Sequence, residues 1–485
     1  MLKSYFFIQL IALLGWYLAG GVSYSEGNLA FFVIMSVLNS LLFFNRIKAC
    51  INTSFCMFVF CVGYLIVFFQ NYLEVLLGSY SLHDMPYTIA GADEIIRCAA
   101  MSSMGMICFF LGVLSIPCPR EPVLSGISSE KIAAPNMKLP GKDVLLWGAL
   151  GGFLLGNYKF LFNVTYSQEL LESRSFLSNM TFIFFQVVFF IFLAYTCHSF
   201  IQLNRKVSLK EFCIKAGWSL NLTALIFILV LVQLGDRGEA LTIVLAYYSA
   251  FLVVSRRKCQ LKYLLIYILA GGLFCAFLAQ FRTFSKDIPL GERIIESANI
   301  FSEKNEHLFF VTEELARSVA TFHNAVATVP DFNPYLYGIF HIADVVNIIP
   351  GAAAVFRNLL GLDHFRYWNS AYFCTWIYWG DEYLWGTGSS WNADLYLNYG
   401  LWGILLGMFI WGYILACLRK KIQIQTPSFY ILLAYLILAG YSLYLNRSNN
   451  FYCIRTLVYA TVFFFCYQKF VNFYQAKRNK KKNYL

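Results

Sequence analysis

The chain has 485 residues, of which 59% are hydrophobic, 19% aromatic and only 13% charged. Soluble domains carry about 25% charged residues, so this composition excludes an ordinary soluble enzyme. The formal net charge of +11 comes from basic loops between apolar segments, which indicates attraction to anionic lipid and not nucleic-acid binding.

Apolar runs of about 20 residues recur along the chain, the length that a helix needs to cross a bilayer core of about 30 Å. The first run has no small-residue cleavage site after a short core, so we expect a retained helix and not a signal peptide. The predicted fold is an all-α polytopic membrane protein with about 12 transmembrane helices. The predicted spans lie near 5–23, 28–45, 54–71, 98–116, 143–163, 181–200, 216–234, 240–255, 262–281, 400–418, 427–445 and 452–467.

The distribution of Lys and Arg predicts the orientation, because these residues are retained on the cytoplasmic side. With the N-terminus inside, the loops on that side hold most of the basic residues, including the tail KRNKKK at 477–482. Both termini are therefore predicted to be cytoplasmic. The opposite short loops hold only Arg97, Arg174, Arg237 and Arg447.

Three regions follow along the sequence: 1–281 with nine spans, 282–399 as one large outer loop, and 400–485 with three spans and the basic tail. A loop of about 118 residues is far longer than an ordinary connection, so we expect it to be functional. Within it, apolar residues of 306–326 recur at spacings of three and four, which predicts an amphipathic helix. The segment 335–351 is too short to span and ends at Pro-Gly, which predicts an interfacial or re-entrant helix.

The stretch GTGSSWNADLYLNYG, 386–400, precedes the tenth predicted span. Its glycines and serines would leave the first helical N–H groups without partners, an arrangement that attracts phosphate. Equally, Ser389 or Ser390 could simply cap the helix, with Asp394 complementing its dipole.

Arginines on the side that excludes positive charge form a second group of candidates. The planar guanidinium suits phosphate oxygens. Arg455 lies inside a predicted span, where a charge is costly and normally faces a polar cavity or a partner. Arg237 could instead pair with Asp236 or Glu239, and for Arg282 an ion-pair or snorkelling role is preferred. The five candidates are Arg237, Arg282, Arg317, Arg447 and Arg455.

A general base could come from the histidines and carboxylates of the outer loop. His323 shares a predicted helix with Arg317, although six residues of helix turn the two side chains about 120° apart. A lone histidine is more often structural. No Cys or Cys/His spacing indicates a metal site, and no cofactor is expected.

Together these features resemble the bacterial O-antigen polymerases, the Wzy group of oligosaccharide repeat-unit polymerases. The segments similar to that family are GDRGEAL after a long span, ARSVATFHNAVATVP followed by YLYG and NIIPG, and GTGSSWNADLYLNYGLWGILLG. The similarity is strongest over about 230–410. Where this chain has Asp394, the family often has Glu.

The resemblance implies a GT-C-like glycosyltransferase of the bacterial inner membrane with its active face periplasmic. It would polymerise undecaprenyl-pyrophosphate-linked oligosaccharide repeat units into O-antigen polysaccharide without a metal, with membrane lipid and a chain-length regulator as further partners. Because a lipid pyrophosphate is a stable leaving group, the reaction needs positive charge and a base, but no strong acid.

The resemblance also assigns roles to residues. His323 is the preferred base, with Asp394 and Glu239 in reserve, and the aromatic side chains of 365–391 would stack on sugar rings. The residues assigned to the pyrophosphate or its sugar are Arg237, Arg317 and Arg447, followed by Arg455 and Arg282.

Two other functions stay open at this point. An O-antigen ligase would use the same donor and a similar layout, with a different acceptor. A flippase or other transporter would place ionisable residues and broken helices at mid-membrane in paired halves. The gathering of polar residues around one asymmetric outer loop favours an enzyme.

Overall fold

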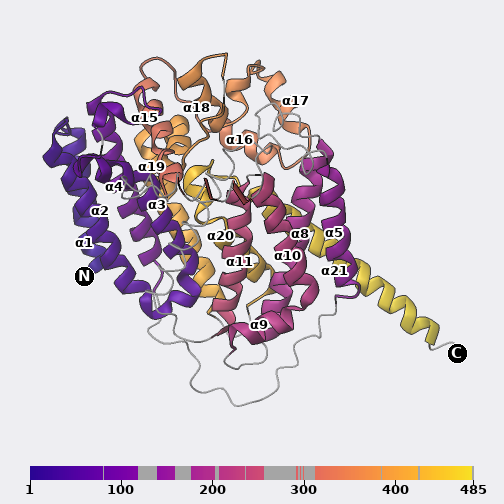
Figure 1. The fold of residues 1–485 in the computed structure, drawn as a ribbon. Coiled ribbons are helices and arrows are strands. Elements are labelled where there is room, and N and C mark those ends of the chain that lie inside the picture. The colour runs from indigo at the N-terminus through magenta and orange to yellow at the C-terminus, as the bar shows by residue number, and fades with distance from the viewer. Residues whose placement is uncertain are drawn as a thin grey trace. The chain divides into compact units, whose positions relative to one another are not determined.

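The structure, a computed structural model, is helical wherever it is described, and no β-strand occurs in the described residues (Figure 1). The described residues are 1–79, 81–117, 139–158, 176–201, 207–234, 236–255, 312–383, 385–423 and 427–482, with a few between 291 and 299.

Several helices are long and apolar enough to cross a membrane. Within the described ranges there are five, or six if the pair Leu209–Ala216 and Trp218–Val232, bent by 96°, counts as one span. The predicted class, an all-α chain with membrane-spanning helices, is thereby confirmed. The five are Glu26–Leu76, Ala92–Leu114, Phe176–Ile201, Arg237–Ser255 and Trp391–Ile422.

The number of twelve spans stays a prediction. Each predicted span except 262–281 overlaps a described helix, and 262–281 lies outside the described residues. One of the overlapping helices, α20 (Phe429–Tyr441), has only 13 residues, about 20 Å of helix, which is short for a bilayer core.

The chain divides into two compact units, each built from separate stretches. Unit 1 comprises Met1–Arg120, Lys258–Lys420 and Tyr441–Tyr452, and the predicted outer loop 282–399 falls wholly within it. Unit 2 comprises Glu121–Arg257, Lys421–Gly440 and Cys453–Leu485.

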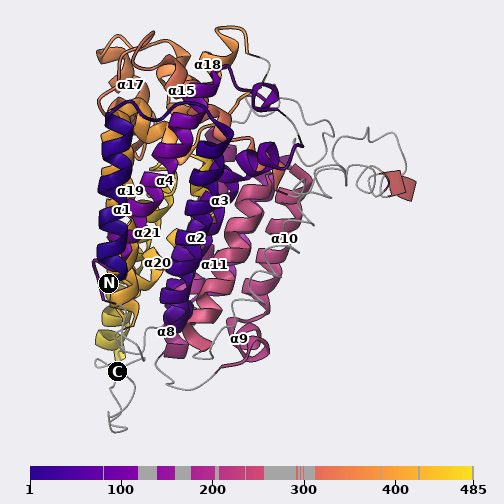
Figure 2. The ribbon, with the colours of Figure 1, turned by 90° about the vertical axis from the view of Figure 1, so that its left-hand side faces the viewer.

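In unit 1, α1 and α2 pack against α4, and α2 packs against α3. Residues 312–383 and 385–390, which we call the cap, form short helices and the segments that connect them, and they lie at one end of these longer helices (Figures 1 and 2). The described helices of unit 1 are α1 (Leu2–Leu18), α2 (Glu26–Ile47), η1 (Lys48–Cys50), α3 (Ile51–Leu76), η2 (Leu82–Asp84), α4 (Ala92–Leu114), α14 (Glu313–Ala316), α15 (Val319–Thr328), α16 (Ile339–Val346), α17 (Ala352–Leu359), η4 (Phe365–Tyr367), α18 (Ser370–Trp379), α19 (Trp391–Ile422, ending past the unit boundary) and η5 (Tyr444–Arg447).

In unit 2, α8 packs against α5, α11 and α21. Phenylalanine rings contribute to this packing: the ring centroid of Phe185 lies 6.4 Å from that of Phe153 in α5, and the ring centroid of Phe184 lies 5.6 Å from that of Phe463 in α21. The described helices of unit 2 are α5 (Lys142–Gly156), α8 (Phe176–Ile201), α9 (Leu209–Ala216), α10 (Trp218–Leu234), α11 (Arg237–Ser255), α20 up to Gly440, and α21 (Ile454–Lys482).

Helix α19 is folded back on itself. The backbone of Gly400 has φ 64° and ψ −153°, which breaks the helix at that residue. The rings of Trp391 and Trp411 lie 5.1 Å apart, whereas twenty residues of continuous helix would separate them by about 30 Å. A Cβ on Gly403 would lie 2.5 Å from the carbonyl oxygen of Leu395. Residues 391–399, which we call the half-helix, therefore run antiparallel to the start of 401–422.

The cap differs from the predicted pattern in two respects. The expected amphipathic helix 306–326 is described only from residue 312, where it forms two pieces, α14 and α15, and α15 is buried from Val319 to Val326. The expected interfacial helix 335–351 is shorter, α16, and a second amphipathic helix, α17, follows Pro350-Gly351. The element that turns back is thus the half-helix and not the segment 335–351.

Candidate functional site

The half-helix concentrates buried polar atoms. All its residues from Trp391 to Asn398 are buried, and Asn392 donates to the hydroxyls of Tyr64 and Ser102 at 2.7 and 3.1 Å. A buried polar atom without a hydrogen-bond partner costs about 1–3 kcal/mol of folding stability. A cluster of such atoms on nine residues is therefore typical of a helix with a function beyond packing. The side-chain atoms with no hydrogen-bond partner among the described residues are Trp391 Nε1, Asn392 Oδ1, Asp394 Oδ1 and Asn398 Oδ1.

The predicted serine cap is absent here. The hydroxyl of Ser390 accepts a hydrogen bond from Thr321 at 3.0 Å, and the hydroxyl of Ser389 lies 3.5 Å from the Ser390 carbonyl oxygen. The two serines instead tie the start of the half-helix to its surroundings, including α15. The backbone carbonyl of Ser390 accepts a hydrogen bond from the N–H of Asp394 at 3.0 Å, so Ser390 precedes the half-helix and its hydroxyl is used by Thr321.

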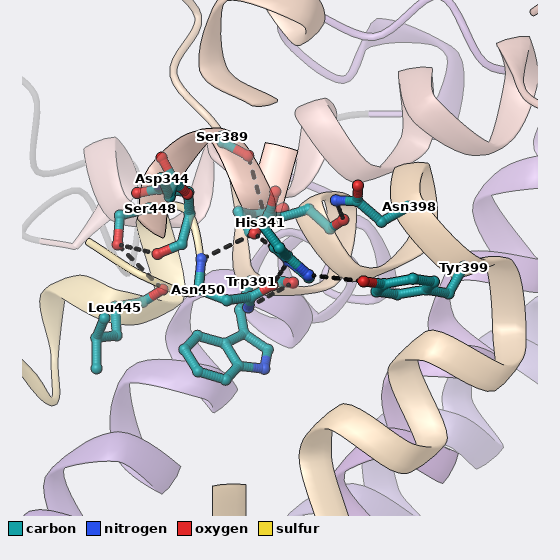
Figure 3. A network of polar contacts seen from close by, with 12 residues as sticks. His341, Asp344, Ser389, Trp391, Asn398, Tyr399, Leu445, Ser448 and Asn450 are labelled. Atoms are coloured by element: carbon teal, nitrogen blue, oxygen red, sulfur yellow. Dashed lines mark hydrogen bonds and ion pairs between the residues drawn. The ribbon is translucent and has the colours of Figure 1, made fainter. Parts of the chain in front are cut away.

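Asp394 is the centre of the site. Its side chain is 0% exposed, and its Oδ2 accepts hydrogen bonds from His341 Nε2 at 3.1 Å and from the backbone N–H of Asn450 at 2.9 Å (Figure 3). Oδ1 has no partner among the described residues. One oxygen is therefore held by two donors, and the other keeps its capacity to accept a proton or a hydrogen bond.

His341 comes from α16, and its side chain is 12% exposed. Its Nδ1 lies 3.3 Å from the hydroxyl of Tyr399 (Figure 3). Phe451 packs edge-on against the imidazole ring. Burial alone would lower the pKa of His341, but the hydrogen bond and charge of Asp394 outweigh it, and the pKa is raised. A raised pKa favours the imidazolium form of His341, in which both ring nitrogens donate.

The backbone of 333–338 positions α16. The N–H of Leu336 donates to the carbonyl oxygen of Leu397 at 2.9 Å, which joins this loop to the half-helix. Gly338 approaches the Tyr399 hydroxyl so closely that a Cβ there would lie 2.5 Å from it. These contacts hold His341 against the half-helix.

The segment 447–450 is the third part of the site, after the half-helix and α16. Asn450 accepts from His341 Nε2 at 3.2 Å and donates to the carbonyl oxygen of Trp391 at 3.3 Å. Asn449 donates to Asp344 of α16. Arg447 pairs with Glu314 of α14 at 2.9 Å. Asn450 thus contacts both members of the His341–Asp394 pair, and Asn449 ties the segment to α16.

His323, the preferred base from the sequence, is buried elsewhere in unit 1. It is 0% exposed, and its Nε2 lies 2.7 Å from the hydroxyl of Tyr72. Burial lowers its pKa to about 3, so the imidazole is neutral and a weak proton acceptor. This geometry gives the base role no support and fits a structural histidine.

The predicted anion-binding residues belong to both units. Arg317 pairs with Glu313, and its guanidinium lies over the ring of Tyr87. Arg317 and Arg447 both belong to unit 1. Arg282 lies outside the described residues. The other predicted site residues belong to unit 2: Arg237 at the start of α11, Arg455 in α21, and Glu239, which accepts a hydrogen bond from Gln186 at 2.6 Å.

Aromatic side chains gather in the cap as expected for 365–391. Trp368 is 42% exposed and Trp385 is 46% exposed, whereas Trp391 is buried. The guanidinium of Arg366 lies 4.4 Å from the ring centroid of Trp376. The exposed rings can stack on a planar or sugar ligand, but Trp391 cannot.

Three parts of the site are only weakly indicated by the sequence: His341, Asp344 and the run 446–450. His341 and Asp344 were among several histidines and carboxylates of the outer loop, with nothing to rank them. In the run NRSNN, 446–450, only the arginine is a candidate from the sequence. Its density of asparagine between two spans is the signal that could have indicated a polar site, because a simple turn does not require it.

Comparison of the chain with protein-family models, with curated proteins and with solved structures finds no match. The helical fold and the geometry of the His341–Asp394 pair therefore carry the functional argument, together with the sequence resemblance.

Proposed function

We propose that this chain is a membrane glycosyltransferase of the O-antigen polymerase type. It would join oligosaccharide repeat units carried on undecaprenyl pyrophosphate at the periplasmic face of the inner membrane. The observation that carries this proposal is Asp394: a fully buried carboxylate with one oxygen held by His341 and Asn450 and the other without a partner among the described residues.

Asp394 is the proposed base. Its Oδ1 accepts the proton of the acceptor hydroxyl. The oxygen of that hydroxyl attacks the anomeric carbon of the donor, and the bond from this carbon to the lipid pyrophosphate breaks. His341 holds Oδ2 and is a positioning residue. Because Asp394 is fully buried, the cap must move to admit the acceptor, as lids do in many enzymes.

Arg447 is the proposed partner of the leaving pyrophosphate. It lies three residues from Asn450, which contacts both members of the His341–Asp394 pair. Its present partner, Glu314, is a half-exposed carboxylate, and a pyrophosphate can replace it with a higher charge density. Arg317, paired with the neighbouring Glu313, is the second candidate in unit 1.

The exposed aromatic rings of the cap suit the sugars. Trp368 and Trp385 present apolar faces against which a pyranose ring can pack, while the hydroxyls of the sugar reach polar side chains such as Asp381. This combination of stacking face and carboxylate is a common way to hold an oligosaccharide in a preformed site.

Gel analysis of lipopolysaccharide from a strain that lacks the gene tests the proposal. Core carrying a single repeat unit, with the ladder absent, supports the polymerase. Bare core with polymer accumulating on the lipid carrier would identify a ligase instead. Complementation with the wild type and with Asp394→Asn, at matched protein levels, separates loss of chemistry from loss of protein.

A transporter is the second candidate, and the half-helix is the observation that favours it. Broken helices that carry a buried carboxylate also form the ion and substrate sites of secondary transporters. In that case the deletion strain would show bare core and no periplasmic polymer. The polymerase is preferred because the polar residues of unit 1 gather around the cap.

A further inference from the structure

Two short helices of the cap expose an aliphatic face. On α16, Ile342, Val345 and the following Ile349 are 49%, 45% and 67% exposed, at helical spacings of three and four. On α17, Val355 and Leu359 are 60% and 81% exposed. The two helices contact each other, and we call their exposed aliphatic side chains together the α16–α17 face.

Neither helix can cross a bilayer. Each has eight residues, about 12 Å of helix, against the roughly 30 Å of a bilayer core. Helices that are short, strongly amphipathic and aliphatic on one side lie in the plane of the membrane interface.

The position of α16 within unit 1 fits that depth. His341 and Gly338 contact Tyr399, next to the turn at Gly400 where the span 401–422 begins. Trp402, 56% exposed, lies at the start of the same span, where interfacial tryptophans are common. The α16–α17 face is therefore at the end of a membrane-crossing helix and not far out in solvent.

The edge of the face carries groups that suit lipid headgroups. Arg357 is in the last turn of α17, and its guanidinium lies 5.6 Å from the ring centroid of Trp368, which is 42% exposed. An arginine beside a tryptophan at the border of an aliphatic surface is typical of the bilayer interface, with the cation near phosphate. The acidic residue of α16, Asp344, is instead hydrogen-bonded to Asn449.

We infer that the α16–α17 face docks into the leaflet of the bilayer that adjoins the cap, with Arg357 at the phosphate groups. The docking sets the depth of His341, which precedes Ile342 on the same helix and points to Asp394. The inference rests on the membrane-spanning character of the chain and does not depend on the proposed polymerase activity.

Site-specific photocrosslinking of the full chain tests this inference. The chain is reconstituted in vesicles of phosphatidylethanolamine and phosphatidylglycerol, with p-benzoylphenylalanine at Val345 or Leu359. Leu406, 60% exposed on the span, serves as the lipid-facing reference, and the exposed Glu382 of the cap serves as the water-facing control. Adducts are identified by mass spectrometry of the intact protein.

We expect phospholipid adducts at positions 345, 359 and 406, and none at 382. Adducts at 406 without any at 345 and 359 would overturn the inference. Crosslinking of 345 or 359 to a second copy of the chain, or to another protein, would overturn it as well, because the face would then be a protein interface. The outcome is independent of the lipopolysaccharide gel, so failure of one proposal is distinguishable from failure of the other.

Discussion

At the scale of single residues, two histidines of unit 1 respond to burial in opposite ways. His323 has only the Tyr72 hydroxyl beside its Nε2, and burial lowers its pKa to about 3. His341 is also mostly buried, but Asp394 supplies a charge and a hydrogen bond that raise its pKa. A carboxylate within hydrogen-bond distance therefore decides whether a buried imidazole is charged.

The lowered pKa of His323 predicts a loss of stability in mild acid. Below the ordinary pKa of 6.5 the unfolded chain binds a proton that the folded site refuses, so stability falls by roughly 1.4 kcal/mol per pH unit down to about 3. His323→Gln should remove roughly 2 kcal/mol of the loss between pH 6.5 and 5. Thermal unfolding in detergent across this range measures it, and equal slopes for variant and wild type would contradict the assignment.

The contribution of His341 to folding stability should change with pH in the opposite direction. Its raised pKa means that its pairing with Asp394 stabilises the fold fully below pH 6.5 and is lost as the pH rises through the higher folded-state value. The difference in apparent unfolding temperature between the wild type and His341→Gln should therefore shrink as the pH rises. A difference that stays constant from pH 6 to 9 would show that the pair does not titrate.

Asp394→Asn should lower the rate of the proposed transfer by far more than the loss of its charge pairing with His341 lowers the folded fraction. The amide keeps the shape of the side chain but cannot accept a proton, and loss of a general base typically costs a factor of about 10²–10⁴. The measurement is chain elongation by the reconstituted protein with lipid-linked repeat units. The matched control is Asp331→Asn, whose carboxylate is exposed and lies outside the proposed site. Equal activity of both variants would remove Asp394 from the chemistry.

At the scale of elements, the half-helix places the site. A continuous α19 would carry Asp394 away from the chain that follows, whereas the turn at Gly400 folds it back beside 401–411. The backbone at Gly400 has a positive φ that other residues rarely adopt, and a Cβ there would lie 3.0 Å from the ring of Tyr335.

Gly400→Val should therefore disrupt the half-helix. We expect a lower apparent unfolding temperature and loss of activity, since Asp394, His341 and Asn450 would no longer meet. Gly148→Val is the comparison, because that glycine lies within helix α5 with no atom within 4 Å of an added Cβ. If both variants unfold at the same temperature, the turn does not depend on glycine.

At the scale of the whole molecule, the asymmetry of charge predicts one orientation in the membrane. The tail 477–482 is strongly basic, and positive-inside retention would keep it cytoplasmic with the cap on the opposite face. Green fluorescent protein fused after Leu485 should fluoresce, and alkaline phosphatase at the same position should be inactive. The reverse pair of results would place the cap in the cytoplasm and exclude a periplasmic polymerase.

The sequence by itself determined the class of this protein. Apolar runs and sparse charge require a lipid-spanning helical chain, because every backbone polar group in a bilayer must bond within its own helix. The same local pattern indicated the long outer loop and the importance of GTGSSWNADLYLNYG, and Asp394 was among the predicted site residues.

Tertiary structure alone decided which residues meet. Periodicity describes one helix at a time, so it could not show that α19 folds back at Gly400 or that His341, Asp394 and Asn450 converge from three separate segments. It also could not show that His323 is buried against Tyr72. Local propensity follows from neighbours in the chain, whereas a proton-transfer site depends on burial and on partners more than fifty residues away, which only packing brings together.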